Sequence, residues 1–157
     1  MLEDLLNSEG LKAVELYRKS FTDNDRVATG KTNQSVAYEV VKTDVSITLS
    51  VYGRKDIGQL ETGVNAAQYN SNPASFGDID EWVDARQQRG DSVPPANSVL
   101  AMLSERGWNT KLPNRTNPNG GTKDIITTPT NQILQSLESK VTAASKDFVL
   151  KQINITV

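Results

Sequence analysis

Apolar residues recur at intervals of three and four along the first twenty positions of the chain. This spacing predicts an amphipathic helix over residues 2–21, ended by the polar turn sequence at 22–25. Ser8 and Gly10 interrupt the early part of the pattern. Because serine is a favoured N-cap residue, the alternative is a helix that begins at Glu9 and leaves the first residues as a separate arm.

The next stretch alternates between apolar and polar positions, which is typical of β-strands. Two such runs cover residues 36–41 and 45–52, and every second side chain from 45 to 51 is aliphatic. The connection at 42–44 is short enough for a β-hairpin. An isolated hairpin is only marginally stable in water, so this one must pack on helices or pair with another chain.

Further helices are predicted in the rest of the chain. A short helical turn over 56–60 is closed by Gly63, an amphipathic helix covers 78–88, and another begins at Pro94-Pro95 and stops at Gly107. The longest helix follows Pro129 and Thr130. Its apolar side chains trace one stripe over roughly four to five turns: Ile133, Leu134, Leu137, Val141, Ala144 and Phe148.

Two long stretches, residues 64–76 and 108–123, show no periodicity and are predicted to be loops. Compact domains favour connections of ~4–6 residues, so loops of this length are either mobile surface or segments ordered by neighbouring subunits. Together the elements predict a single domain over residues 1–157. Its fold class is α+β, with a small antiparallel β-sheet (hairpin 36–52) packed against an N-terminal helix, short helices and a long C-terminal helix.

Composition narrows the chemistry that the chain can perform. It has no cysteine and no histidine, which excludes thiol nucleophiles, zinc-thiolate sites and the commonest general base. Its 17 Lys+Arg and 19 Asp+Glu give a net charge of -2, so there is no general basic field for nucleic acid. No apolar stretch approaches the ~20 residues of a membrane span. The acidic N-terminus does not resemble a signal peptide, and we expect a protein made in a cytosol.

Residues 28–32, Ala-Thr-Gly-Lys-Thr, invite comparison with a phosphate-binding loop. That loop needs a glycine five residues before Gly30, where this chain has Asp25, and a buried strand immediately before it. The local interpretation is better: Gly30 supplies a turn, and Thr32 caps a short helical turn that leads into the hairpin.

Acidic residues gather at the start of the helix predicted over 78–88. Asp80 and Asp84 share one face and could contribute to a Mg²⁺ site, but one helix rarely supplies all the oxygens that such a metal needs. Acidic side chains at a helix N-terminus are the simpler interpretation. A paired-carboxylate glycosidase usually has an aromatic cleft, whereas only nine residues here are aromatic. An enzyme is therefore the least favoured class, and we predict no catalytic, cofactor-binding or metal-binding residue.

Four short segments stand in a particular order along the chain. They are Ala-Thr-Gly-Lys-Thr at 28–32 before the hairpin, Tyr-Gly-Arg at 52–54, Gln-Leu-Glu-Thr-Gly at 59–63, and Ile-Asp-Glu-Trp-Val at 79–83, with a long C-terminal helix after them. This succession resembles the small neck and tail-completion proteins of tailed bacteriophages, which are structural proteins that assemble into rings beneath the portal. The resemblance spans roughly residues 10–153.

The resemblance implies a virion protein without catalysis or cofactor, made in the host bacterial cytoplasm. It implies a cyclic homo-oligomer of six or twelve copies at the head–tail connection, in contact with the portal and other neck or tail proteins and with no membrane. DNA passes through the ring as cargo, and a near-neutral charge suits that role because a basic lumen would hold the phosphates. The alternatives are a non-viral cytosolic adaptor domain and, third, a carboxylate-metal enzyme.

Subunit or portal contact is predicted at the hairpin face and at the segment 56–63, with the two loops reaching adjacent rings. On this prediction, Leu60→Asp impairs assembly more than folding. The residues predicted to form the interface are Asp56, Gln59, Leu60, Glu61, Thr62 and Gly63.

Overall fold

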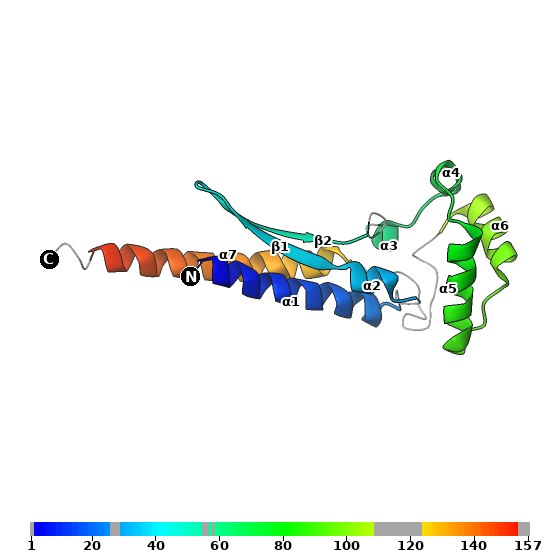
Figure 1. Cartoon of the computed structure of the whole chain (residues 1–157), viewed down its shortest axis with the longest axis horizontal. Helices are drawn as coiled ribbons and strands as arrows, with labels where there is room; N and C mark the ends of the chain where they lie inside the picture. Colours follow the sequence, from blue (N-terminus) through cyan, green and yellow to red (C-terminus); the bar gives the residue numbers. More distant parts are fainter. Residues whose placement is uncertain (1, 26–28, 55–56, 58, 109–123, 154–157) are drawn as a thin grey trace.

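The computed structural model describes residues 2–25, 29–54, 57, 59–108 and 124–153, with side chains described as far as residue 145. Helices and one antiparallel hairpin form an elongated molecule, so the predicted α+β fold class is confirmed (Figure 1). The elements are α1 (Leu2–Asp23), α2 (Lys31–Ser35), β1 (Ala37–Lys42), β2 (Ile47–Tyr52), α3 (Gln59–Thr62), α4 (Ala66–Ser71), α5 (Phe76–Gln88), α6 (Ala96–Arg106) and α7 (Thr127–Ile153).

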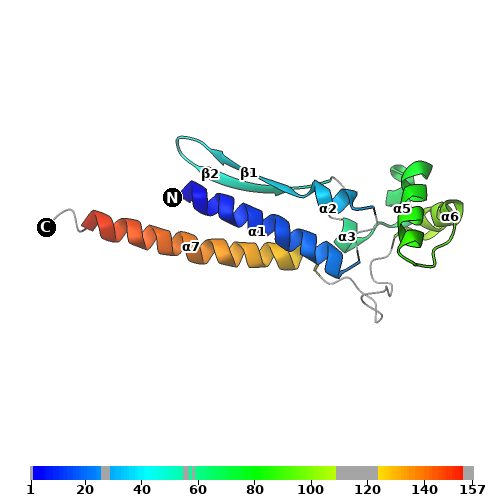
Figure 2. The same cartoon turned by 60° about the horizontal axis from the view of Figure 1, so that its bottom comes forward.

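The molecule has a long body and a smaller lobe at one end. In the body, α1 and α7 run antiparallel and the hairpin lies along α1 (Figures 1 and 2). The short helix α2 precedes β1, and α3 follows β2. The lobe consists of α4, α5 and α6, with α6 packed against the other two.

Helix α1 is continuous through Ser8 and Gly10, so the alternative of a separate N-terminal arm is wrong. Gly10 is needed for the approach of the hairpin, because a Cβ at this position would lie 2.2 Å from the ring of Tyr38. The buried stripe of α1 faces both the hairpin and α7. The residue that interrupts the helical pattern in the sequence is therefore a contact point between α1 and β1.

The hairpin has the predicted alternation, and its connection covers residues 43–46 instead of the predicted 42–44. β1 and β2 pair in register from Ala37↔Tyr52 to Lys42↔Ile47. Ile47 and its alternate neighbours in β2 are half-buried, while the intervening side chains are exposed. β2 begins at Ile47 instead of residue 45, because Val45 lies in the turn. Among the residues that the structure describes, neither strand pairs with a third strand, so both outer edges of the sheet are open.

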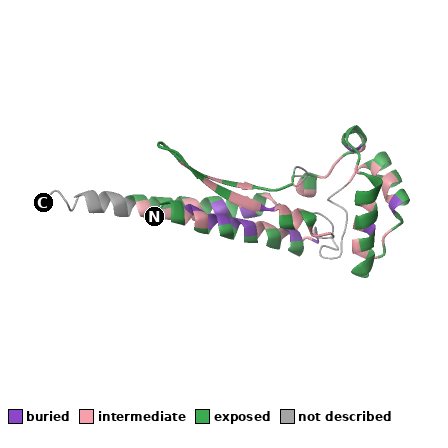
Figure 3. Cartoon of the chain, viewed as in Figure 1, coloured by how far each residue is buried: buried purple, intermediate pink, exposed green. Residues whose placement is uncertain are grey.

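The core of the body is small and lies at the junction of α1, the base of the hairpin and the start of α7 (Figure 3). Phe21 and Ile125 are fully buried there. The chain exposes 10410 Å², about a third more than the ~7,800 Å² expected of a compact monomer of 17.2 kDa. The elongated chain therefore leaves much of its surface for other molecules to cover.

Part of the segment 64–76, predicted to be a loop, is a helix. α4 begins after Asn65, whose side chain accepts the amide N–H of Gln68, while the Gln68 side chain accepts the amide N–H of Asn65. This reciprocal capping box supports a helix that has no apolar periodicity. The other predicted loop covers residues 108–123. Its first residue, Trp108, pairs with Val64 in a short antiparallel bridge, and residues 109–123 lie outside the described residues.

The remaining helices differ from the predictions mainly at their first residues. Ser75 caps α5 by accepting the amide N–H of Asp78 at 3.1 Å, so the helix starts two residues earlier than predicted. α6 ends at Gly107 as predicted. The predicted capping role of Thr32 is wrong: Thr32 lies inside α2, and Gly30, in the left-handed region, is the N-cap.

Candidate interaction surfaces

The segment predicted to form an interface surrounds α3. Asp56 lies outside the described residues. Gln59 and Thr62 are exposed, whereas Leu60, Glu61 and Gly63 are half-buried. Gln59 and Thr62 can therefore contact another molecule directly. The three half-buried residues also make contacts within the chain.

Leu60 packs against the core cluster of the body, which includes Val14, Phe21 and Val36. A carboxylate at this position would lie against apolar side chains and would have to remain hydrated or find a partner. The expected consequence of Leu60→Asp therefore changes: it lowers the stability of the separate chain as well as any assembly.

Glu61 joins α3 to the first turn of α7. Its Oε2 accepts the amide N–H groups of Ile126 at 2.7 Å and Thr127 at 3.0 Å, and its Oε1 accepts the Thr127 hydroxyl at 2.6 Å. Burial raises the pKa of Glu61, but the hydrogen bonds from Thr127 and from the Ile126 amide outweigh burial, and the net pKa is lowered. Glu61 thus caps α7 as an anion at a helix N-terminus.

A crevice of about 510 Å³ separates the body from the lobe, and no sequence pattern indicated it. Its volume lies within the ~300–1,000 Å³ of clefts that bind drug-sized ligands. Both tryptophans of the chain, Trp82 and Trp108, line it. The other apolar lining residues come from α3, α4, α5 and α6 and the segments next to them, and include Leu60, Tyr69, Ile79, Val99, Met102 and Leu103.

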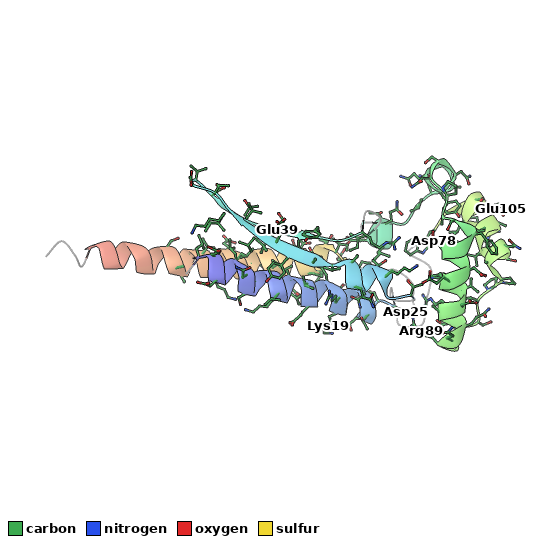
Figure 4. All side chains as sticks on the ribbon, in the orientation of Figure 1. Lys19, Asp25, Glu39, Asp78, Arg89 and Glu105 are labelled. Atoms are coloured by element: carbon green, nitrogen blue, oxygen red, sulfur yellow. The ribbon has the colours of Figure 1, made fainter. Side chains whose placement is uncertain are left out.

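Charged side chains hold the lobe to the body beside this crevice. The buried carboxylate of Asp25, at the end of α1, accepts from Arg86 at 2.6 Å and from Arg89, both on α5. Figure 4 shows Asp25 and Arg89 close to each other at the junction. Lys31 of α2 pairs with Glu81 of α5. Arg86 also pairs with Asp91 at 3.0 Å, so three acidic and three basic groups at the junction balance one another.

Asp25 is held ionised by these two arginines. Burial raises the pKa of its carboxyl, but hydrogen bonds and charge from Arg86 and Arg89 outweigh burial and lower the pKa below its ordinary value. Its backbone adopts φ 55°, a left-handed conformation that aspartate tolerates better than most residues. The sequence identified this position only as part of a turn.

Three buried polar atoms at the crevice have no hydrogen-bond partner in the described part of the molecule. They are Tyr69 Oη, Arg86 Nε and Asn33 Oδ1, and all three residues line the crevice. Most buried polar groups in proteins are hydrogen-bonded, so three unpartnered atoms around one space are unusual. Two of them are donors that lack an acceptor.

Within the described part of the chain, the acidic residues of α5 do not form a metal site with other segments. Asp78 accepts from Ser75, Glu81 pairs with Lys31, and Asp80 and Asp84 are exposed. Over the described ranges no cluster of three or more potential metal ligands occurs. Within the same ranges, none of the helices is long and apolar enough to cross a membrane.

The chain matches no protein-family model, no curated protein and no solved structure. Function is therefore inferred from its residues and its fold alone.

Proposed function

We propose that the chain is a structural, non-enzymatic virion protein of a tailed bacteriophage. In this proposal six or twelve copies form a ring in the neck, at the head–tail connection or the tail-completion position, in contact with the portal and other neck or tail proteins. DNA passes through the ring. The sequence segments at 28–32, 52–54, 59–63 and 79–83 support the proposal by their order along the chain.

The open hairpin is the observation that carries the proposal. Residues 41–46, at its tip, are all exposed, and the tip rises away from α1 (Figures 1 and 2). Soluble monomers usually protect or shorten a strand edge, because an open edge pairs with other chains. A ring supplies such protection, since each copy can cover the hairpin of the next.

The long helices also favour assembly. α7 extends beyond the start of α1 (Figures 1 and 2). Leu134 is 57% exposed and Val141 is 37% exposed on α7, and Leu11 on α1 is 58% exposed. Single exposed aliphatic residues are ordinary, but here they lie on helices of a chain whose core is small. Contacts between copies would bury them.

Charge is compatible with a channel for DNA. A net charge of -2 provides no excess of cations to neutralise phosphates along a duplex. DNA that must move through a ring during packaging or ejection should not be retained by its wall. A lumen densely lined with lysine and arginine would argue against this part of the proposal.

Portal binding tests the function directly. The gene for the chain is expected beside genes for a portal protein and a major capsid protein. The purified chain is expected to co-sediment with that portal, with six or twelve copies of the chain in each complex. A chain that stays monomeric and does not bind the portal contradicts the proposal. A stable monomer or dimer encoded away from virion genes would instead favour the adaptor domain.

A further inference from the structure

The register of the hairpin determines which of its backbone groups face outward. The amide N–H of Thr43 donates to the Ser46 carbonyl at 2.8 Å, so this pair is hydrogen-bonded and the pairs alternate from there along the ladder. Val40 and Leu49 therefore face each other without exchanging hydrogen bonds, and their N–H and C=O groups point to the two outer edges. The residues with outward-facing groups are Tyr38, Val40 and Lys42 on β1 and Ile47, Leu49 and Val51 on β2.

The two outer edges of the sheet have few of the features that prevent strand pairing. Over the residues that the structure describes, neither edge is paired with another strand. Pairing runs through both strands without a bulge, and neither strand contains proline. Bulges, prolines and lysines are common protections of an edge, and here only Lys42, at the end of β1, is of that kind. Both edges can therefore accept a further strand.

We propose that β1 of one copy pairs with β2 of the next copy, so that the sheet continues from copy to copy. The inference rests on the proposed function and states how its ring is joined. A second copy fits each edge because every copy carries both halves of the contact. Each half is a six-residue strand with three outward-facing residues, and each of these residues offers one N–H and one C=O.

Cyclic symmetry gives this contact the correct strand direction. Rotation about the axis of a ring does not change the direction of a strand along that axis. β1 and β2 run in opposite directions within one copy, so β2 of one copy meets β1 of the next antiparallel. Every strand then has two antiparallel neighbours and no edge of the sheet stays open. Pairing of β2 with β2 about a twofold axis would leave the edge of β1 open and would stop at two copies.

The side chains on both faces of the sheet are compatible with this pairing. The outward-facing residues direct their side chains to the half-buried face of the hairpin, and residues paired across strands share a face. The joined sheet therefore continues that face from copy to copy. On the opposite face, β1 carries Glu39 and Val41, and β2 carries only uncharged residues, so no like charges meet. Val41 is 44% and Tyr52 54% exposed in the separate chain, and both gain neighbours on this face.

Amide hydrogen exchange of the natural chain tests the contact residue by residue. In the separate chain the amides of Val41 and Thr48 should exchange slowly, because they bond within the hairpin, whereas those of Val40 and Leu49 should exchange freely. Assembly should slow exchange at Val40 and Leu49 by at least about tenfold. Unchanged exchange at both residues overturns the inference. Protection of Leu49 without Val40 indicates twofold pairing of β2, and protection only in the presence of the portal indicates a portal strand; either result also overturns it.

Proline variants remove single outward-facing donors. Val40→Pro and Leu49→Pro remove no hydrogen bond within the hairpin, because these two amides face outward, where an edge strand tolerates proline. Each variant should weaken the contact between copies about tenfold, and the ring repeats that loss at every contact. Val40→Ala and Leu49→Ala are the matched controls, because they lose side-chain contacts but keep the amide donor. Proline variants that assemble as well as the alanine variants contradict the inference. If a proline variant fails to fold, the exchange experiment on the natural chain still decides.

The outcomes distinguish this inference from the proposed function. A ring in which the amides of Val40 and Leu49 still exchange freely overturns the inference and leaves the ring intact. Protection of both amides in fibres of open-ended length supports the strand pairing and contradicts the closed ring. A chain that remains monomeric at every concentration overturns both.

Discussion

At the scale of single residues, Glu9 shows how the two long helices recognise each other. Its carboxylate is 2% exposed between α1 and α7, where it accepts from Lys12 at 2.9 Å, from the Ser136 hydroxyl at 2.7 Å and from Lys140. A buried charge is tolerated only when it is paired in this way, and loss of a partner is costly. Burial raises the pKa of Glu9, but the bonds from Lys140, Ser136 and Lys12 outweigh it and lower the pKa to about 2.

This pairing predicts how stability depends on pH. Because the carboxyl of Glu9 has its pKa lowered from 4.5 to about 2 in the folded chain, the unfolded chain binds the proton first as pH falls. The stabilisation, at most about 3 kcal/mol, is therefore present above pH 4.5 and is lost as pH falls toward 2. The lowered pKa values of Asp25 and Glu61 act in the same direction.

Urea unfolding at pH 7 and at pH 3 measures this effect. The midpoint should be lower at pH 3, and Glu9→Gln should remove part of the difference between the two pH values. Equal midpoints at pH 7 and pH 3 for the natural chain would show that the buried carboxylates are not held ionised as described.

Gly10 offers a test of the contact between helix and hairpin. Gly10→Ala should lower the free energy of unfolding by about 1–3 kcal/mol, because the new Cβ would lie 2.2 Å from the Tyr38 ring and must displace it. Gly77→Ala in α5 is the matched control. The nearest atom to its Cβ is Ser75 Oγ at 4.0 Å, so the alanine should be neutral or stabilising by up to about 1 kcal/mol. Equal effects of the two variants would contradict the packing of Tyr38 on Gly10.

At the scale of elements, α7 begins where a residue distant in the sequence caps it. Pro129 was predicted to precede the helix, yet α7 starts at Thr127 and includes Pro129 in its first turn, where proline is tolerated. Glu61 supplies the cap from α3. A start set by a contact across more than sixty residues cannot be inferred from local sequence patterns.

Glu61→Gln should lower the free energy of unfolding by about 1 kcal/mol, because the amide loses the charge that the helix N-terminus favours. Glu138→Gln, at an exposed position on α7, should change it by less than about 0.5 kcal/mol. Thermal unfolding followed by circular dichroism compares the two. A Glu138→Gln effect as large as that of Glu61→Gln would argue against the cap.

The interface predicted around α3 can be separated from the core that it touches. The double variant Gln59→Arg, Thr62→Arg replaces two exposed side chains, so it should leave unfolding unchanged and weaken portal or subunit binding. Leu60→Asp should lower stability by about 2–4 kcal/mol, because a charge replaces a leucine packed on the core. If the double variant binds the portal or other subunits as well as the natural chain does, α3 is not part of the interface.

The periodicity of apolar residues predicted the elements that bury one apolar face, and it missed α4, which has no such face. The alternation in β2 and the helical spacing in α1, α5 and α6 follow from burial of one face, so these elements were found within a few residues. α4 has Tyr69 as its one buried residue, and its signal was the pair Asn65 and Gln68, which form the capping box. Helix ends were less accurate because caps such as Ser75 depend on single side chains.

At the scale of the whole molecule, the crevice could not be predicted because its walls come from segments far apart in the chain. The lobe meets the body through Asp25 with Arg86 and Arg89, side chains more than sixty residues apart, and the sequence identified only a turn and a helix end at these positions. Composition gave a different kind of information. The absence of cysteine and histidine restricted the possible chemistry but said nothing about where surfaces meet.

Native mass measurement over a range of protein concentrations shows whether copies of this chain close into a ring. We expect one discrete species of six or twelve times 17.2 kDa and no series of longer forms. A monomer or dimer that persists at every concentration, with or without the portal protein, would contradict it.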